Sequence, residues 1–215
     1  ADIGIENGKI TKIGMIPENA ESQEKIDAKG LLLIPGFIDA HSHFETAVFD
    51  NRFKFGRIAQ GITSDIVGNC GPTPAPYDPI WESMLKNMYY SLTGTGLMFP
   101  WDWKTMGGYL DAIETTGSPS NIASLVGHGT LRTLAAGHAD RPLTREELDK
   151  VKNILEQSLE EGAAGLGLGL SYIPGIAATK AELIELAKAC REHGAIVAAH
   201  RRDEGHMAVE AVDEM

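Results

Sequence analysis

The chain has few cysteines, no long apolar run and a deficit of basic residues. Its two cysteines, Cys70 and Cys190, lie far apart among 215 residues, which is poor evidence for a disulfide framework. We expect Cys190, on the apolar side of a predicted helix, to belong to the core. No apolar stretch approaches the roughly 18 residues needed to cross a bilayer, and no basic start precedes a short apolar segment. We therefore expect a soluble, cytoplasmic protein.

The charge of the chain argues against two classes of partner. Its 30 acidic and 19 basic residues give a net charge of -11. Nucleic acids and anionic membranes bind through clustered Lys and Arg, so neither is expected as a partner. With 43% apolar residues, the chain can bury the core of one large domain, or of a domain with a small appendage.

Residues 1–30 are predicted to form a small β unit outside the main domain. Ile3 and Ile5 alternate with polar neighbours, and Asn7-Gly8 is a strong signal for a hairpin turn. A short antiparallel sheet is therefore expected here.

Residues 31–215 are predicted to form an α/β domain, because short apolar runs alternate with helical patterns. The expected strands cover 36–43, 62–68, 122–127, 164–170 and 196–200. The clearest helices cover 144–161, after a capping box at Thr144 and Glu147, and 179–193, before Gly194. Residues 72–107 are expected to form a long loop over a barrel mouth. About five such βα units predict part of a TIM-type (β/α)8 barrel.

Two histidines lie one residue apart at the end of the first predicted strand, in the segment PGFIDAHSHFE, residues 35–45. Alternate residues of a strand point to the same side, so His41 and His43 are expected to face one ion together. Neutral imidazoles are good zinc ligands, and two of them leave coordination positions for water or further groups. The alternative is a pair of unrelated histidines at a strand end.

Two further candidate ligands follow other predicted strands. Cys70 lies just beyond the second strand, and His200 ends the fifth. The carboxyl ends of all strands in a parallel barrel open on one face, so both residues are expected near the histidine pair. A metal deprotonates a coordinated thiol, whose sulfur can bridge two ions. The alternatives are a buried structural thiol and an ordinary core histidine.

Five segments together resemble the D-aminoacylase branch of the amidohydrolase superfamily. They occur in the order and at about the spacing of that family. Besides residues 35–45, they are GITSDIVGNCG (61–71), SLVGHGTLR (124–132), GAAGLGLGLSYIPG (162–175) and AAHRRDEG (198–205).

This resemblance implies a fold, a cofactor and a substrate class. Residues 1–30 would be the remnant of an N-terminal β-sandwich, and residues 31–215 the N-terminal portion of a metal-dependent hydrolase barrel. The cofactor would be one or two zinc ions, and the substrate a small-molecule N-acyl-D-amino acid. The residues that match the family's metal ligands are His41, His43, Cys70 and His200.

Three residues are candidates for contact with substrate. Tyr172 lies in a segment that resembles the family loop bordering the substrate, although a tyrosine beside Pro-Gly is also a common packing anchor. Arg202 lies among charges that either orient ligands or begin a helix, and His128 ends the third predicted strand. Arg132 has the fork to clamp a carboxylate, but a surface position is expected for it.

Glycines occupy alternate positions of the fourth predicted strand, at Gly165, Gly167 and Gly169. Glycine in a strand marks the close approach of a ligand or of another backbone. A strand without side chains on its barrel side would leave space for the metal site. Plain tight packing is the alternative.

The resemblance implies metal-assisted hydrolysis of a linear amide bond, in which an aspartate from the eighth strand passes a proton to the leaving amine. No residue of this chain matches that aspartate, so we expect it beyond residue 215 and expect the chain alone to be inactive.

Two alternative functions and one mode of assembly are also expected from the sequence. A cyclic-amide hydrolase of the dihydroorotase or hydantoinase type is an alternative, but those enzymes usually carry a lysine in the fourth strand, and this strand has none. A non-catalytic metal-binding or assembly fragment is another alternative. The exposed edges of a partial barrel predict homo-oligomers.

Overall fold

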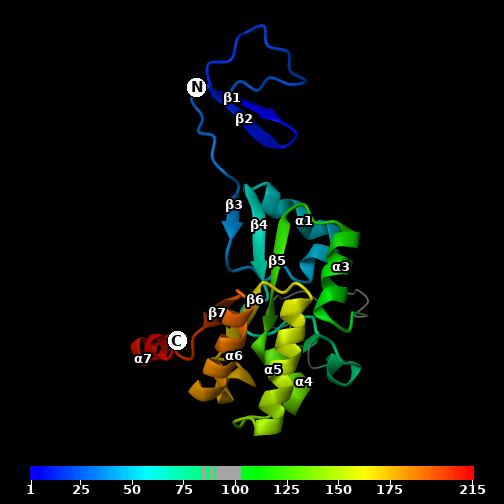
Figure 1. Ribbon diagram of the computed structural model, residues 1–215, viewed down its shortest axis with the longest axis vertical. Helices are drawn as coiled ribbons and strands as arrows, with labels where there is room; N and C mark the ends of the chain where they lie inside the picture. Colours follow the sequence, from blue (N-terminus) through cyan, green and yellow to red (C-terminus); the bar gives the residue numbers. More distant parts are fainter. Residues whose placement is uncertain (84–85, 88–89, 91–102) are drawn as a thin grey trace. The chain divides into compact units, whose positions relative to one another are not determined.

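The computed structural model describes residues 1–83, 86–87, 90 and 103–215 and divides into two units, Ala1–Pro35 and Gly36–Met215. The first unit contains an antiparallel hairpin of β1 (Asp2–Glu6) and β2 (Lys9–Gly14) (Figure 1). Its turn residues, Asn7 and Gly8, have φ values of 51° and 72°, as a tight hairpin turn requires. The predicted hairpin is confirmed, and its membership of a β-sandwich stays a prediction.

The second unit is built on a parallel sheet of five strands that follow the order of the sequence, β3-β4-β5-β6-β7 (Figure 1). The strands are β3 (Phe37–Asp39), β4 (Ile62–Val67), β5 (Asn121–Gly127), β6 (Gly165–Gly169) and β7 (Ile196–His200). The last four agree closely with the predicted strands, whereas the first ends earlier than predicted.

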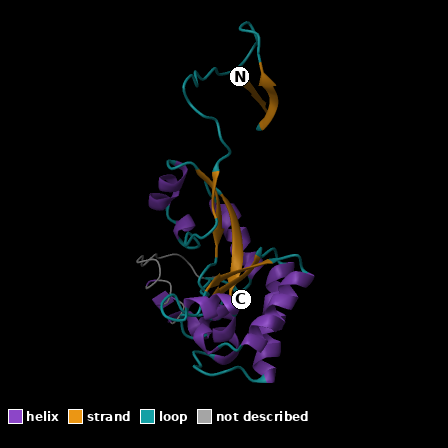
Figure 2. Cartoon of the chain, turned by 90° about the vertical axis from the view of Figure 1, so that its left-hand side faces the viewer, coloured by secondary structure: helices purple, strands orange, loops and turns teal. Residues whose placement is uncertain are grey.

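Helices connect successive strands, as a parallel sheet requires, and a last helix follows β7. They are α1 (Asn51–Ile58), α3 (Met106–Thr116), α4 (His128–Ala136), α5 (Arg145–Glu160), α6 (Lys180–Glu192) and α7 (Ala208–Asp213). Short 3-10 helices are η1 (Ala47–Phe49), η2 (Pro79–Trp81) and η3 (Gly175–Ala177). Figure 2 shows the helices arranged around the strands. Much of the loop predicted over 72–107 lies outside the described residues.

Local sequence signals set the ends of the two longest helices. The Thr144 hydroxyl accepts from the backbone N–H of Glu147, and the Glu147 side chain accepts from the backbone N–H of Thr144, so the predicted capping box begins α5. Beyond α6, Gly194 adopts a φ of 66°, a left-handed conformation that commonly ends helices. Both predicted helices are confirmed.

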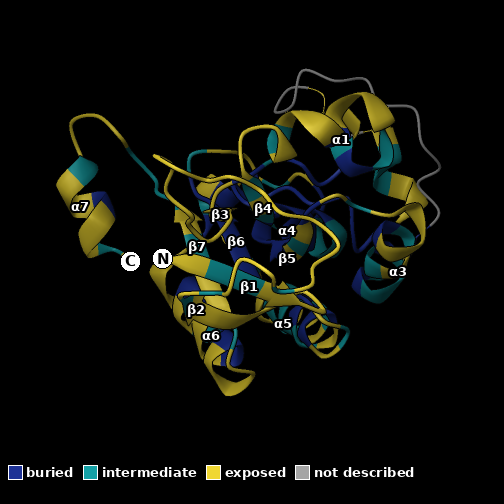
Figure 3. Cartoon of the chain, turned by 90° about the horizontal axis from the view of Figure 1, so that it is seen from above, coloured by how far each residue is buried: buried dark blue, intermediate teal, exposed yellow. Residues whose placement is uncertain are grey.

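The core is concentrated around the middle of the sheet. Every residue of β6 is buried, and Leu166 and Leu168 of that strand belong to one apolar cluster with Val151 and Leu155 of α5. The edge strands β3 and β7 are largely exposed (Figure 3). The strand order and the alternating helices are those of part of a (β/α)8 barrel. In the described part of the chain, no helix combines the length and the apolar character needed to cross a membrane.

Candidate metal centre

A loop, rather than a strand, carries His41 and His43. Because β3 ends at Asp39, the prediction that this strand reaches His43 was wrong. The Asp39 carboxylate accepts from the backbone N–H of His41 at 3.2 Å, a local bond that competes with continuation of the strand. Asn69 donates to the carbonyl of Ser42 at 3.4 Å and so holds the loop against the end of β4.

Cys70 lies in a tight turn directly after β4. Gly68, Cys70 and Gly71 have φ values of 85°, 59° and 95°. For a non-glycine residue, this left-handed backbone costs of the order of 1–3 kcal/mol, and such strain clusters at functional sites. The turn passes closely over β6, since a Cβ at Gly169 would lie 1.9 Å from the carbonyl oxygen of Cys70. The bare face of β6 therefore makes room for the backbone that presents Cys70.

The ligand atoms of His41, His43 and Cys70 form one group, in which all lie within 4.8 Å of one another. His41 Nε2 is 3.3 Å from Cys70 Sγ. Donors that share a tetrahedral zinc ion at its usual bond lengths are about 3.5 Å apart. Two imidazoles and a thiol at these separations fit a zinc ion in both chemistry and size.

The surroundings shift the pKa values of the two histidines in opposite directions. The neighbouring Cys70, followed by Glu45, raises the pKa of His43 to about 10. Burial, followed by repulsion from His43 and His200, lowers the pKa of His41. The site therefore favours a neutral ring at His41 and a ring with an added proton at His43. A metal ion would replace that proton among the same donors.

His200 reaches the group from the end of β7. Its Nδ1 lies 3.5 Å from Cys70 Sγ and 3.3 Å from the hydroxyl of Tyr172. The rings of Tyr172 and His200 meet edge to face, with their centroids 4.8 Å apart. The structure therefore brings all four predicted ligands together, with His200 beside the trio and Tyr172 against His200.

Glu45 is a member of this site that the sequence analysis missed. Its side chain is fully buried, and Oε1 accepts from the backbone N–H of Gly68 at 2.6 Å and lies 3.5 Å from His43 Nδ1. Oε2 is buried without a hydrogen-bond partner. The available signal was an acidic residue two positions after His43, but burial of an acid is uncommon enough that nothing in the sequence singled it out.

Comparison with known proteins places the chain in a family. Residues 24–214 match the model of the amidohydrolase family. The chain belongs to this family. It is 33% identical to the D-aminoacylase of Alcaligenes xylosoxydans xylosoxydans, covering 100% of this chain and 43% of that protein. It is 35% identical to the N-acyl-D-glutamate deacylase of the same organism, covering 100% of this chain and 42% of that protein.

Solved structures agree with this assignment. A D-aminoacylase crystal structure matches with a TM-score of 0.72 and 30% identity, covering 84% of this chain and 37% of that one. The N-acyl-D-glutamate deacylase from Bordetella bronchiseptica, complexed with zinc and a phosphonate inhibitor, matches with a TM-score of 0.72 and 32% identity over 84% of this chain and 36% of that one. The predicted D-aminoacylase branch and partial barrel are confirmed. The amidohydrolase chain spans less than half the length of its relatives.

Two basic residues of α4, His128 and Arg132, have partners inside the protein. Arg132 is fully buried and donates to both carboxylate oxygens of Glu182 at 2.7 and 2.6 Å, so the expected surface position was wrong. His128 is also fully buried, and its Nε2 lies 2.8 Å from Glu182 Oε1. This trio joins α4 to α6. A substrate contact from His128 stays a prediction.

Arg202 is similarly occupied by internal contacts. Its guanidinium donates to Glu214 at 2.9 and 2.7 Å and to the carbonyls of Ile176 and Ala178 at 2.5 and 3.0 Å. These bonds connect the segment after β7 to η3 and to the end of α7. Arg202 thus holds these segments together. A contact between Arg202 and the substrate stays a prediction.

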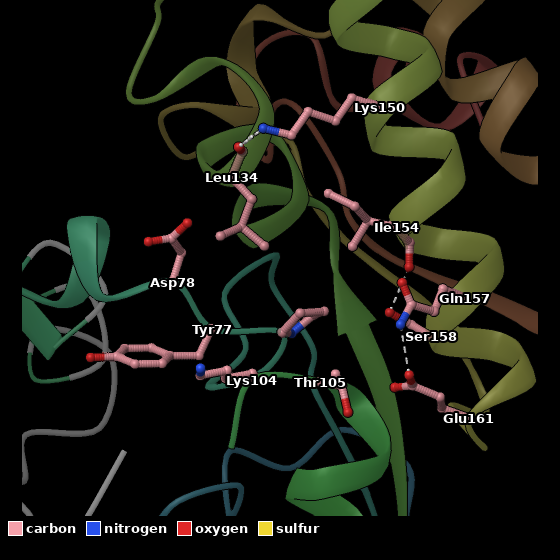
Figure 4. A pocket seen from close by; sticks show the side chains of 11 residues that line it. Tyr77, Asp78, Lys104, Thr105, Leu134, Lys150, Ile154, Gln157, Ser158 and Glu161 are labelled. Atoms are coloured by element: carbon pink, nitrogen blue, oxygen red, sulfur yellow. Dashed lines mark hydrogen bonds between the residues drawn. The ribbon is translucent and has the colours of Figure 1, made fainter. Parts of the chain in front are cut away.

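A separate pocket lies between the segments that precede η2 and α3 and the helices α4 and α5 (Figure 4). Its volume is about 220 Å³, and its walls include Tyr77, Lys104, Lys150, Ile154 and Glu161. None of the predicted site residues lines it. Lys150 donates to the carbonyl of Leu134 at 2.7 Å, so this amine already has a partner in the protein.

Proposed function

We propose that this amidohydrolase chain supplies the metal-binding part of the active site of a hydrolase that cleaves the linear amide bond of N-acyl-D-amino acids, with zinc as the metal. The observation that carries the proposal is the convergence of His41, His43 and Cys70, with His200 beside them. The names of the D-aminoacylase and N-acyl-D-glutamate deacylase relatives indicate the substrate class. The zinc in a related deacylase structure indicates the metal.

The chain's own residues have distinct parts in this proposal. When bound, zinc supplies Lewis acidity, which lowers the pKa of water to about 7 and polarises a carbonyl group. The two imidazoles and the Cys70 sulfur would hold it. Burial, together with the nearby Cys70 and Glu204, raises the pKa of Tyr172. A tyrosine hydroxyl, whose ordinary pKa is about 10, keeps its proton near neutral pH, so Tyr172 can donate a hydrogen bond to an anionic or carbonyl oxygen of the substrate.

The proposal differs from the cyclic-amide alternative at β6. This strand contains only glycine and leucine (Gly165–Gly169), so it offers no lysine of the kind expected for a dihydroorotase or hydantoinase. The backbone of the turn at residues 68–71 fills the space above Gly167 and Gly169. In the proposed site the sulfur takes the central position among the donors.

Two buried cysteines allow a matched test of the metal site. Cys70 belongs to the donor group, whereas Cys190 lies in the apolar core. In chelator-competition titrations, the chain and its Cys190→Ala variant should bind zinc, and Cys70→Ala should bind it at least tenfold more weakly. Absence of zinc binding, or equal loss in both variants, would contradict a metal site at Cys70.

The substrate class needs a separate assay. We expect the chain alone to bind zinc without turnover, because no residue in it matches the proton-transferring aspartate that the family resemblance implies. In a protein that contains these residues together with that aspartate, N-acetyl-D-amino acids should be hydrolysed, and Cys70→Ala should abolish the hydrolysis. Zinc binding without hydrolysis in such a protein would favour the non-catalytic metal-binding alternative.

A further inference from the structure

Glu45 connects the two segments that carry the candidate ligands. It follows His43 by two residues, and its carboxylate accepts from the backbone N–H of Gly68, two residues before Cys70. Its own backbone is fixed as well, because the buried hydroxyl of Tyr109 on α3 donates to the Glu45 carbonyl at 2.8 Å. One side chain therefore ties the histidine loop to the cysteine turn.

The carboxylate also faces the ring of His43. Oε1 lies 3.5 Å from His43 Nδ1, slightly longer than a direct hydrogen bond but within the range of a strong electrostatic attraction. With Nδ1 directed at the carboxylate, Nε2 is the ring nitrogen left for a metal. Histidines that bind metals almost always donate their second N–H to a carboxylate, a carbonyl or water, which fixes the tautomer and raises the basicity of the ligand.

Hydrogen bonds from the protein satisfy only part of the buried carboxylate of Glu45. The side chain is fully buried, and Oε2 has no hydrogen-bond partner. Carboxylates are rarely buried in proteins unless a cation or several hydrogen-bond donors face them. The ring of His43, with a metal ion bound on its far side, would give the carboxylate a partner of positive charge, whereas a purely structural link to Gly68 could be made by a neutral group.

We propose that Glu45 is a positioning residue, which holds His43 with Nδ1 protonated and fixes its distance from Cys70 through Gly68. This inference rests on the proposed zinc site. It assigns Glu45 no contact with the metal or the substrate.

Glu45→Gln tests the inference, with Glu182→Gln as the matched control. Glutamine keeps an acceptor for Gly68 but removes the charge. Glu182 is also a buried glutamate, but its partners are His128 and Arg132. In chelator-competition titrations of the whole chain, Glu45→Gln should weaken zinc binding by about 10- to 100-fold, and Glu182→Gln should remain within about threefold of the unmodified chain.

The outcomes separate this inference from the proposed function. If the unmodified chain binds no zinc, the proposed zinc site fails and the inference fails with it. If the chain binds zinc and Glu45→Gln binds it equally well, only the role of Glu45 is overturned. Equal weakening by Glu182→Gln would also overturn that role, because loss of a buried charge anywhere would then explain the effect.

A measurement on the unmodified chain covers the case in which Glu45→Gln does not fold. Long-range ¹H–¹⁵N NMR spectra of the zinc-loaded chain distinguish the two tautomers of each histidine ring. His43 should carry its proton on Nδ1, as expected from its position beside Glu45. A proton on Nε2, with the metal at Nδ1, would refute the proposed role of Glu45.

Discussion

Replacing Gly169 with alanine should damage the metal site through the backbone of Cys70. The new Cβ would lie 1.9 Å from the carbonyl oxygen of Cys70 and 2.5 Å from its carbonyl carbon. Carbon and carbonyl oxygen atoms normally approach to about 3.3 Å, so one backbone must move by about 1.4 Å. Both backbones are buried, which leaves no flexible side chain to absorb the movement.

A displacement of this size should affect both stability and binding. Overpacking of a core costs typically about 1–3 kcal/mol, which corresponds to a melting temperature lower by about 3–10 °C for a chain of this length. Binding constellations tolerate displacements of only about 0.5 Å. We therefore expect Gly169→Ala to weaken zinc binding by at least about tenfold.

Gly56→Ala provides the control for this experiment. Gly56 lies within α1, and a Cβ there would meet nothing within 4 Å. The free energy of unfolding of this variant should equal that of the unmodified chain or exceed it by up to about 0.5–1 kcal/mol. The variant should bind zinc normally. Calorimetry of the metal-free chains and chelator-competition titration measure the two effects. If Gly169→Ala melts and binds zinc like the unmodified chain, the close approach of the Cys70 turn to β6 is not the constraint that we describe.

Three further predictions concern other parts of the chain. Arg132→Met should lower the free energy of unfolding by about 3–5 kcal/mol, because it leaves Glu182 buried without its cation. Denaturant unfolding at constant pH measures this loss, and a loss below about 1 kcal/mol would contradict the prediction. Hydrogen bonding to Arg141 lowers the pKa of Glu147 to about 2, so the pair stabilises the folded chain above about pH 4.5, and this contribution disappears as the pH falls through 2. In an NMR titration, Arg141→Ala should move the Glu147 midpoint upward, toward 4.5, and an unchanged midpoint would contradict the pairing. The exposed apolar edges β3 and β7 should cause self-association, and a monodisperse monomer in light scattering would count against it.

Strand positions and helix starts could be predicted from the sequence, because short local patterns determine them. The strands β4 to β7 contain short apolar stretches bounded by turn residues, and α5 begins at the capping box of Thr144 and Glu147. Each signal lies within a few residues of the structure that it specifies. The alternation of strands and helices also predicted the partial barrel and placed the candidate ligands at one end of it, and the family resemblance then added the zinc and the substrate class.

The predictions that failed depended on contacts between distant residues. The end of β3 depends on Asp39, whose carboxylate is held by Arg57 of α1 as well as by the backbone of His41. The burial of Arg132 depends on Glu182, 50 residues later in the chain. Arginine is almost never fully buried unless it is paired, and no local pattern reveals which partner it has.

The candidate ligands differ in the contacts that fix their positions. These contacts indicate which parts of the fold should control zinc affinity. The Cys70 turn is packed on β6, and the carbonyl of Gly71 accepts from the backbone N–H of Thr130 at 3.2 Å. The histidine loop is fastened by bonds to the β3 and β4 segments. His200 instead ends β7, an edge strand of the described sheet. The His41, His43 and Cys70 trio is therefore ordered by contacts among β3 to β6 and α4. Changes within that part of the fold should alter zinc affinity more than changes on the exposed side of β7.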